Sequence, residues 1–198
     1  WIYKQYDSQV QSNTVFKPGV SDAAVIRLRE QNEKNKDKVF SGVAASVDCN
    51  SRWVSLDPYR GTIAAVAESA RNVSCVGAEP LAITNNLNFS SPETEIGYWQ
   101  LSSSCNGISE ACKVLKTPVT GGNVSLYNES KNKDNETTPI NPTPVIGMIG
   151  KIENVDQAIS SEWKNINDEI WLIGSYKSET TIAASSYLEY FHGEITGR

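Results

Sequence analysis

Histidine is nearly absent from this sequence: His192 is the only one in 198 residues, and the four cysteines form no C-x-x-C pair. Structural zinc sites take their ligands from closely spaced cysteines and histidines, so the sequence argues against such a site. Cys105 and Cys112 lie on one face of a predicted helix, two turns apart. We interpret them as buried reduced thiols, which are typical of a protein from the reducing cytoplasm.

Long apolar runs and an excess of positive charge are also missing. No stretch is apolar for long enough to span a bilayer, and a net charge of −5 argues against a nucleic-acid-binding protein. With 39% hydrophobic and 21% charged residues, the composition is that of a globular protein with room for one core and part of another. Because the chain begins with Trp1 rather than methionine, we expect it to be a segment of a longer protein.

The spacing of apolar residues predicts alternating strands and helices. Strands are predicted at residues 25–29, 39–47, 80–87, 119–126 and 143–152, and helices at 62–76 and 92–115. This β-β-α-β-α-β-β order favours an α+β (α/β) domain in which a mixed sheet carries its helices on one face.

The remaining segments are predicted to connect these elements or to begin a second domain. We expect a charged hairpin tip at 30–38, a loop at 48–60 and a mobile polar insertion at 131–141. A sixth strand is predicted at 168–174. We therefore assign residues 1–152 to one domain and residues 153–198 to a linker and the truncated start of another α/β domain.

Three predicted strands lead into polar segments, which read DCN at 48–50, NNLN at 85–88 and GGNVS at 121–125. Polar segments that converge at strand ends are common ligand sites in such folds. The two glycines would allow the backbone to approach a phosphate closely, although Gly-Gly-Asn is also ordinary turn chemistry. No Gly-Lys-Ser/Thr follows, so the segment is not a Walker A loop. From these residues alone, a ligand loop and a simple turn are both open.

Five segments taken together resemble one known family. They are YDSQVQSNTV (6–15), DCNSRWVSLDPYRG (48–61), AVAESARNVSCVGAEPLAITNNLNFSSPE (65–93), TPVTGGNVSLYNES (117–130) and PTPVIGMIG (142–150). In this order and spacing they resemble the second half of phosphoribosylformylglycinamidine synthase, the ATP-dependent amidotransferase of purine synthesis. The resemblance covers most of residues 1–152, and DEIWLIG with YLEYFHG resembles the start of the domain that follows.

The resemblance implies a fold and a set of partners. Residues 1–152 would form the N-terminal domain of an aminoimidazole-ribonucleotide-synthetase-like fold, paired with the related first half of the same synthetase. The family is a cytoplasmic ligase that uses ATP and Mg²⁺ to activate formylglycinamide ribonucleotide, and a glutaminase domain or subunit supplies ammonia. It binds neither nucleic acid nor membrane.

The resemblance also implies roles for four residues. Asn85 and Gly122 would contact the nucleotide, Asn123 would bind Mg²⁺, and Ser125 would bind the substrate. Many members carry an aspartate where this chain has Asn85, which keeps a hydrogen-bonding oxygen but loses the charge. The family's catalytic histidine and main magnesium carboxylates lie in the first half, so no catalytic residue is assigned here, and we expect this chain alone to be inactive.

Two other readings of the sequence are open. The chain could belong to another ATP-dependent synthetase of the same superfamily, or it could be a non-catalytic domain that binds nucleotide or mediates dimerisation. Likewise, the polar residues of segment 48–60 could line the ligand site or could stabilise their own loop. They are Asp48, Asn50, Arg52, Asp57 and Arg60.

Overall fold

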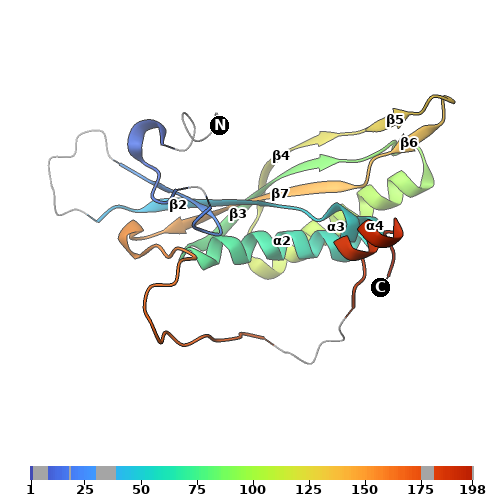
Figure 1. Cartoon of the computed structure of the whole chain (residues 1–198). Helices are drawn as coiled ribbons and strands as arrows, with labels where there is room; N and C mark the ends of the chain where they lie inside the picture. The colour runs from blue at the N-terminus through green and yellow to red at the C-terminus, as the bar shows by residue number, and fades with distance from the viewer. Residues whose placement is uncertain (2–8, 18, 30–38, 175–180, 198) are drawn as a thin grey trace. The chain divides into compact units, whose positions relative to one another are not determined.

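The computed structural model describes residue 1 and residues 9–17, 19–29, 39–174 and 181–197 (Figure 1). The chain divides into two compact units, Trp1–Ser161 and Glu162–Arg198. The predicted hairpin tip at 30–38 lies outside the described residues.

A five-stranded mixed sheet forms the centre of the first unit. Its strands are β1 (Ala24–Arg27), β2 (Gly42–Asp48), β3 (Glu79–Asn88), β4 (Val119–Ser125) and β7 (Thr143–Ile152). Their order is β1-β2-β7-β3-β4, and only the β3–β4 pair is parallel. The mixed sheet and the α+β class predicted from the sequence are therefore confirmed.

Two long helices, α2 (Pro58–Cys75) and α3 (Glu95–Leu115), lie along one face of this sheet (Figure 1). Asp57 caps α2 by accepting from the Arg60 amide, and Pro58 suits the first helical position. Thr94 caps α3 in the same way, and Lys116 ends it in the left-handed conformation. The helices approach closely because Gly107 of α3 packs on the backbone of Tyr59, where a Cβ would lie 2.5 Å from the carbonyl oxygen.

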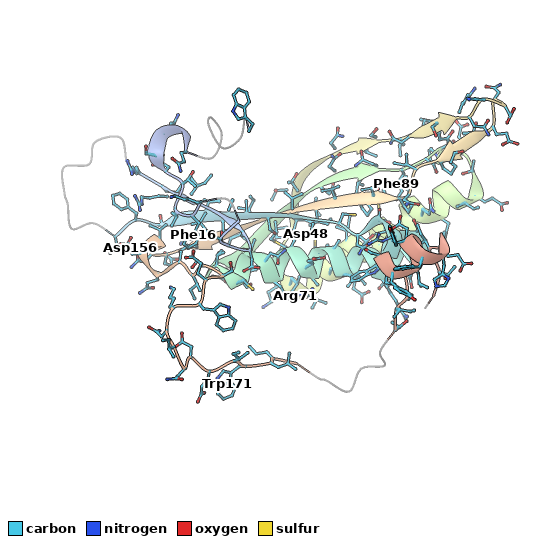
Figure 2. All side chains as sticks on the ribbon, in the orientation of Figure 1. Phe16, Asp48, Arg71, Phe89, Asp156 and Trp171 are labelled. Carbon is cyan, nitrogen blue, oxygen red and sulfur yellow. The ribbon has the colours of Figure 1, made fainter. Side chains whose placement is uncertain are left out.

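The core lies between this helical layer and the sheet. Residues on alternate positions of the strands are buried against residues on one face of each helix. The fully or almost fully buried members include Val25, Ala44, Ile83, Ile146, Met148, Val66, Val73 and Ile108. Phe89, labelled in Figure 2, is fully buried just beyond β3 and joins the same cluster.

Segment 48–60, predicted as a loop, contains a short helix. It is α1 (Ser51–Leu56), and Asn50 caps it by accepting from the Trp53 amide at 3.3 Å. Asp57 ends α1 and at once begins α2. The loop prediction was wrong because polar caps at both ends of one helical turn look like a loop in sequence.

The polar insertion at 131–141 is part of a β-hairpin, and its mobility stays a prediction. β5 (Glu129–Lys131) pairs with β6 (Thr137–Pro139) as a separate two-stranded sheet. Oδ1 of Asn132 accepts from the amides of Asp134 and Glu136, which closes the turn. Every residue of both strands is exposed, so the hairpin gave no apolar alternation from which it could be predicted.

The second unit contains one described helix, α4 (Ser186–His192). Its N-cap is Ser185, whose side chain accepts from the Leu188 amide. The strand predicted at 168–174 is wrong: this segment is irregular, and Trp171 (Figure 2) is 78% exposed. Within the described part of this unit no second strand is present to pair with it. The domain boundary after residue 152 stays a prediction, although the first compact unit runs to Ser161.

Candidate functional site

The three polar segments lie toward the same end of the sheet. β2, β3 and β4 run in one direction, with antiparallel β7 between β2 and β3. Ile146 of β7 pairs with Asp48 of β2 on one side and with Asn85 of β3 on the other. Asn85 in turn pairs with Gly122 of β4. The expected convergence is therefore present. However, NNLN and GGNVS lie within β3 and β4 and not in the loops that follow them.

The four residues assigned by resemblance occupy one strip along the β3–β4 pair, but on two faces of it. Asn85 is opposite Gly122, and Asn86 and Asn88 are opposite Asn123 and Ser125. Because side chains alternate along a strand, Asn85 and Gly122 belong to the helix-covered face. Asn123 and Ser125 belong to the face without helices, which we call the open face.

Gly122 is required by its neighbour Asn85. A Cβ at Gly122 would overlap Oδ1 of Asn85 and lie 2.8 Å from its carbonyl oxygen, whereas a Cβ at Gly121 would meet nothing within 4 Å. Both glycines lie inside β4. The interpretation of the pair as an ordinary turn is therefore wrong. The group that approaches the backbone of Gly122 closely is the side chain of Asn85.

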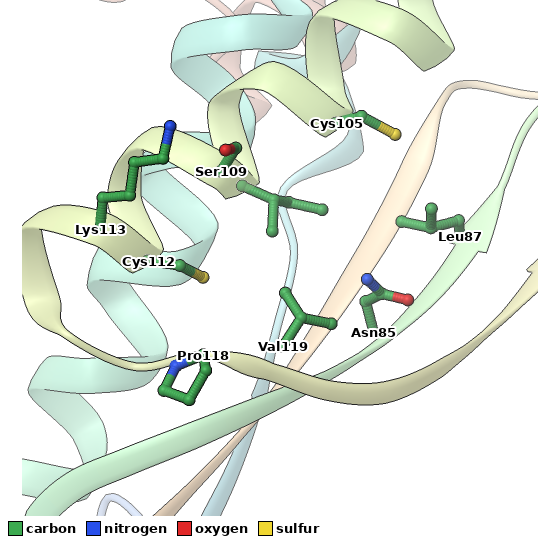
Figure 3. Close-up of a pocket in the computed structure, with 9 residues that line it drawn as sticks. Asn85, Leu87, Cys105, Ser109, Cys112, Lys113, Pro118 and Val119 are labelled. Atoms are coloured by element: carbon green, nitrogen blue, oxygen red, sulfur yellow. The ribbon is translucent and has the colours of Figure 1, made fainter.

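A cavity of about 500 Å³ separates α3 from the β3–β4 pair, and Figure 3 shows the residues that line it. Asn85 and Leu87 project into it from β3, and two cysteines project from α3. The lining residues are Asn85, Leu87, Cys105, Ile108, Ser109, Cys112, Lys113, Pro118 and Val119. Asn85 thus places its amide in a mainly apolar groove.

The two cysteines of this groove differ in exposure. Cys112 is buried as expected, but Cys105 is exposed, so the prediction for Cys105 was wrong. Cys105 lines the open groove between α3 and the sheet, and a seven-residue repeat cannot show that such a groove exists. Partial burial raises the pKa of both thiols, which favours their protonated form.

Asparagine side chains form a polar patch on the open face. Nδ2 of Asn123 donates to Oδ1 of Asn86 at 3.2 Å, which leaves the Asn123 amide oxygen available to a ligand. Ser125 donates to Oδ1 of Asn128 at 3.1 Å. The resemblance did not assign Asn86 or Asn128. The alternation of NNLN could have placed Asn86 on the same face as Asn123, and a turn after β4 brings Asn128 back to Ser125, three residues earlier.

Most of the polar residues of segment 48–60 stabilise the fold. Figure 2 shows Asp48 at the end of β2 beside α2, where it accepts from Ser69 Oγ at 2.7 Å and Asn72 Nδ2 at 2.9 Å. As described above, Asn50 and Asp57 are helix caps. Arg60 forms an exposed ion pair with Asp57 at 3.7 Å. For these four residues the structural reading is favoured.

Cys49, which follows Asp48 in the sequence, is a poor nucleophile. Burial, together with the nearby negative charge of Glu68, raises the pKa of its thiol from 9.0 to about 11. In the part of the chain that the structure describes, no group of three or more His, Cys, Asp or Glu side chains could hold a metal ion. None of the described helices is long and apolar enough to cross a membrane.

Comparisons with known proteins identify the origin of this arrangement. Residues 20–152 match the family described as AIR synthase related protein, N-terminal domain. The whole chain is 91% identical to a 25% portion of phosphoribosylformylglycinamidine synthase subunit PurL from Prochlorococcus marinus strain MIT 9312. It is 58% identical, over 206 residues, to the same subunit from strain NATL2A. These similarities confirm the resemblance drawn from the sequence.

Solved structures agree with these relatives. Thermotoga maritima PurL complexed with ATP is 36% identical and has a TM-score of 0.63, over 79% of this chain and 23% of that one. T. maritima PurL complexed with FGAR is 35% identical with a TM-score of 0.59, over 79% and 23%. The chain spans about a quarter of the length of the curated relatives it matches.

Proposed function

The chain belongs to the family of AIR synthase related proteins, and we therefore propose that it forms part of a phosphoribosylformylglycinamidine synthase. That enzyme uses ATP and ammonia from glutamine to convert formylglycinamide ribonucleotide into the amidine. The observation that carries the proposal is the β3–β4 strip. It places every residue assigned to nucleotide, metal and substrate on two adjacent parallel strands in register.

Nucleotide and substrate are proposed to meet around the edge strand β4, because the residues assigned to them lie on its two faces. A relative of similar fold has been solved with ATP, and the same relative has been solved with FGAR. Asn85 offers an amide donor and acceptor on the helix-covered face, and Gly122 leaves room for that side chain beside the backbone of β4. Ser125, half-buried at the end of β4, offers a hydroxyl to the ribonucleotide.

The residues present suit a shared Mg²⁺ site and not a complete one. The amide oxygen of Asn123 is a hard neutral ligand of the kind that Mg²⁺ accepts. Among the described residues it has no cluster of carboxylates beside it. Mg²⁺ would therefore take its other ligands from nucleotide phosphates and from the first half. When bound it would neutralise phosphate charge, while Asn123 would orient the phosphates along β4.

The first half is proposed to pack on the open face. Apolar side chains are exposed there on three neighbouring strands: Ile26 at 49%, Val47 at 71% and Ile149 at 38%. Such a patch on one face of a sheet is typical of an interface. The active site would lie between the halves, beside Asn123 and Ser125. A glutaminase domain or subunit and a cytoplasmic location complete the proposal.

The proposal is tested by ATP hydrolysis that depends on the ribonucleotide. The longer protein that carries this chain should release ADP only when formylglycinamide ribonucleotide and a nitrogen source are both present. The isolated chain of 198 residues should release none, because it lacks the catalytic histidine. Ribonucleotide-independent hydrolysis by the longer protein, or turnover by the isolated chain, would contradict this division of labour.

A non-catalytic nucleotide-binding domain is the second candidate. The lack of a carboxylate or histidine cluster among the described residues favours it over other synthetases of the superfamily. The two candidates differ in one measurable property of the longer protein. A structural site would retain nucleotide through turnover without exchanging it, whereas a catalytic site would exchange ADP for ATP once per cycle. Pre-loading with radiolabelled ATP and following its release distinguishes them.

A further inference from the structure

We propose that Asn128 is a positioning residue. It fixes the hydroxyl of Ser125 as a hydrogen-bond acceptor, so that Ser125 selects an N–H or O–H donor of the ribonucleotide and not its phosphate. The inference rests on the proposed function, because it requires that Ser125 contact the ribonucleotide. Asn128 lies beyond the end of β4, in the turn that leads into β5.

The orientation of the Asn128 amide is determined by its neighbours. Nδ2 lies 2.8 Å from the carbonyl oxygen of Ser125 and 3.1 Å from that of Phe89. Carbonyl oxygens only accept hydrogen bonds, so the NH₂ end of the amide must face them. Flipping the amide would place an oxygen against two oxygens. Oδ1 of Asn128 therefore faces Oγ of Ser125, at 3.1 Å.

This orientation decides what Ser125 can offer to a ligand. An amide oxygen only accepts, so the single hydroxyl hydrogen of Ser125 is used in the bond to Asn128. The oxygen retains lone pairs, and Ser125 lies on the same open face as Asn123. A phosphate oxygen only accepts and cannot bond to those lone pairs. An amide N–H or a ribose O–H can.

The turn that carries Asn128 is held at several points. Tyr127 has φ 59°, a left-handed conformation that non-glycine residues rarely adopt. Its amide donates to the carbonyl of Ser90 at 3.3 Å, and its hydroxyl donates to Glu93 at 3.1 Å. The amide of Asn128 donates to the carbonyl of Phe89 at 3.1 Å. The structure around the turn thus compensates an unfavourable backbone angle and keeps Asn128 against Ser125.

A double-mutant cycle in the longer protein tests the coupling. Binding of formylglycinamide ribonucleotide and, separately, of ATP is measured by calorimetry for Ser125→Ala, Asn128→Ala and the pair. Each single change should weaken ribonucleotide binding by about fivefold to tenfold, the usual effect of one hydrogen bond. The pair should be no weaker than Ser125→Ala, because Asn128 acts through Ser125. ATP affinity should stay within about twofold, as should both affinities in the control Asn106→Ala, an exposed position on α3.

A second cycle locates the group that Ser125 contacts. Removing the phosphate of the ribonucleotide should weaken binding by the same factor in the wild type and in Ser125→Ala. Methylating the amide nitrogen in one analogue, and the ribose hydroxyls in another, separates the two possible donors. The analogue that loses affinity in the wild type but not in Ser125→Ala identifies the donor.

A pH series with Asn128→Asp tests the bonds that Asn128 donates to the two carbonyls. The ionised carboxylate cannot donate to the two carbonyls, so ribonucleotide binding should be weak at pH 8. Binding should recover toward the wild-type value as the pH falls, because the protonated acid again has a donor and an acceptor. A pH response identical to that of the wild type would contradict the proposal.

Besides that pH response, four results would overturn the inference. The first is a loss of ribonucleotide affinity in the double variant equal to the product of the two single losses, and the second is a loss of ATP affinity in Asn128→Ala as large as its loss of ribonucleotide affinity. The third is a smaller effect of removing the phosphate in Ser125→Ala than in the wild type. The fourth is that no methylated analogue loses affinity in a way that depends on Ser125. If the wild-type protein binds ATP but no ribonucleotide, the proposed function itself fails, and the inference fails with it. That outcome differs from one in which the protein binds ATP and the ribonucleotide but the effects of Ser125→Ala and Asn128→Ala on binding free energy simply add.

Discussion

The two faces of the central sheet are built from the same strands but do different work. On the helix-covered face, Ile83, Ile146 and Met148 are fully or almost fully buried, and Asp48 is hydrogen-bonded to α2. On the open face, Val47 is 71% exposed, and Asn123 presents an amide oxygen to solvent. One face therefore stabilises the domain, and the other is available for the first half and for the ligand. Because side chains alternate along a strand, the four assigned residues are divided between these two faces. Asn85 and Gly122 lie on the helix-covered face, and Asn123 and Ser125 lie on the open face.

Truncating one side chain on each face gives the largest expected difference. Ile146→Ala should lower the free energy of unfolding by about 2–5 kcal/mol, because it leaves a cavity in the core. Val47→Ala, on the neighbouring strand but on the open face, should cost less than about 0.5 kcal/mol in the isolated chain at concentrations too low for self-association. Urea unfolding followed by circular dichroism measures both. Equal losses would mean that the open face is covered in solution.

The two glycines of β4 test the comparison within one strand. Gly122→Ala should cost about 1–3 kcal/mol of stability, because its Cβ would collide with Asn85 on the helix-covered face. Gly121→Ala should cost little, since nothing lies within 4 Å of its added Cβ. Thermal unfolding of both variants is the measurement. Adding Asn85→Ala to Gly122→Ala should restore part of the loss. If it restores none, the collision with Asn85 is not the cause.

A charge on the open face should change association more than stability. The isolated chain is expected to self-associate through Ile26, Val47 and Ile149, because no sister domain covers them. Val47→Glu should weaken that association by about tenfold, as measured by sedimentation, since it would bury a charge in the contact. Glu162→Gln, an exposed position in the other compact unit, serves as the control. Unchanged association in Val47→Glu would place the contact elsewhere.

A last comparison concerns Cys49, the residue that follows β2, and its effect is confined to alkaline pH. Its pKa is raised from 9.0 to about 11 by burial and by Glu68, so the folded chain keeps the proton longer than the unfolded chain. Stability should be unaffected below pH 9 and should fall as the pH rises from about 9 to 11. Cys49→Ala should flatten this alkaline decline in denaturant titrations. An unchanged decline would show that other groups cause it.

The long, regular elements were predictable from local pattern. The apolar spacing of residues 62–76 and 92–115 predicted α2 and α3, and the predicted strands correspond to β1, β2, β3, β4 and β7 within a few residues. The predictions were wrong where a segment was polar throughout, or where an apolar segment had no neighbouring strand to pair with. The capped turn of α1 and the exposed β5–β6 hairpin carry no apolar period, and apolar segment 168–174 finds no neighbouring strand in the described part of its unit.

The candidate site was only half determined in this way. The motif residues Asn85, Gly122, Asn123 and Ser125 could be named from the sequence, and strand alternation already implied that Gly122 and Asn123 face opposite ways. Which of them faces the helices could not be known. That depends on which side of the sheet α2 and α3 cover, and the packing of the whole core decides it.

By itself, the sequence determined the two long helices, the five strands of the central sheet and the family to which the chain belongs, because these depend on local chemistry and on order along the chain. The tertiary structure alone decided the β3–β4 register, the contact between Gly122 and Asn85 and the contact between Asn128 and the Phe89 carbonyl. Residues 85 and 122 are distant in sequence, and their contact forms only when the core between sheet and helices closes. A pattern of neighbours along the chain carries no information about such a contact until packing selects one arrangement.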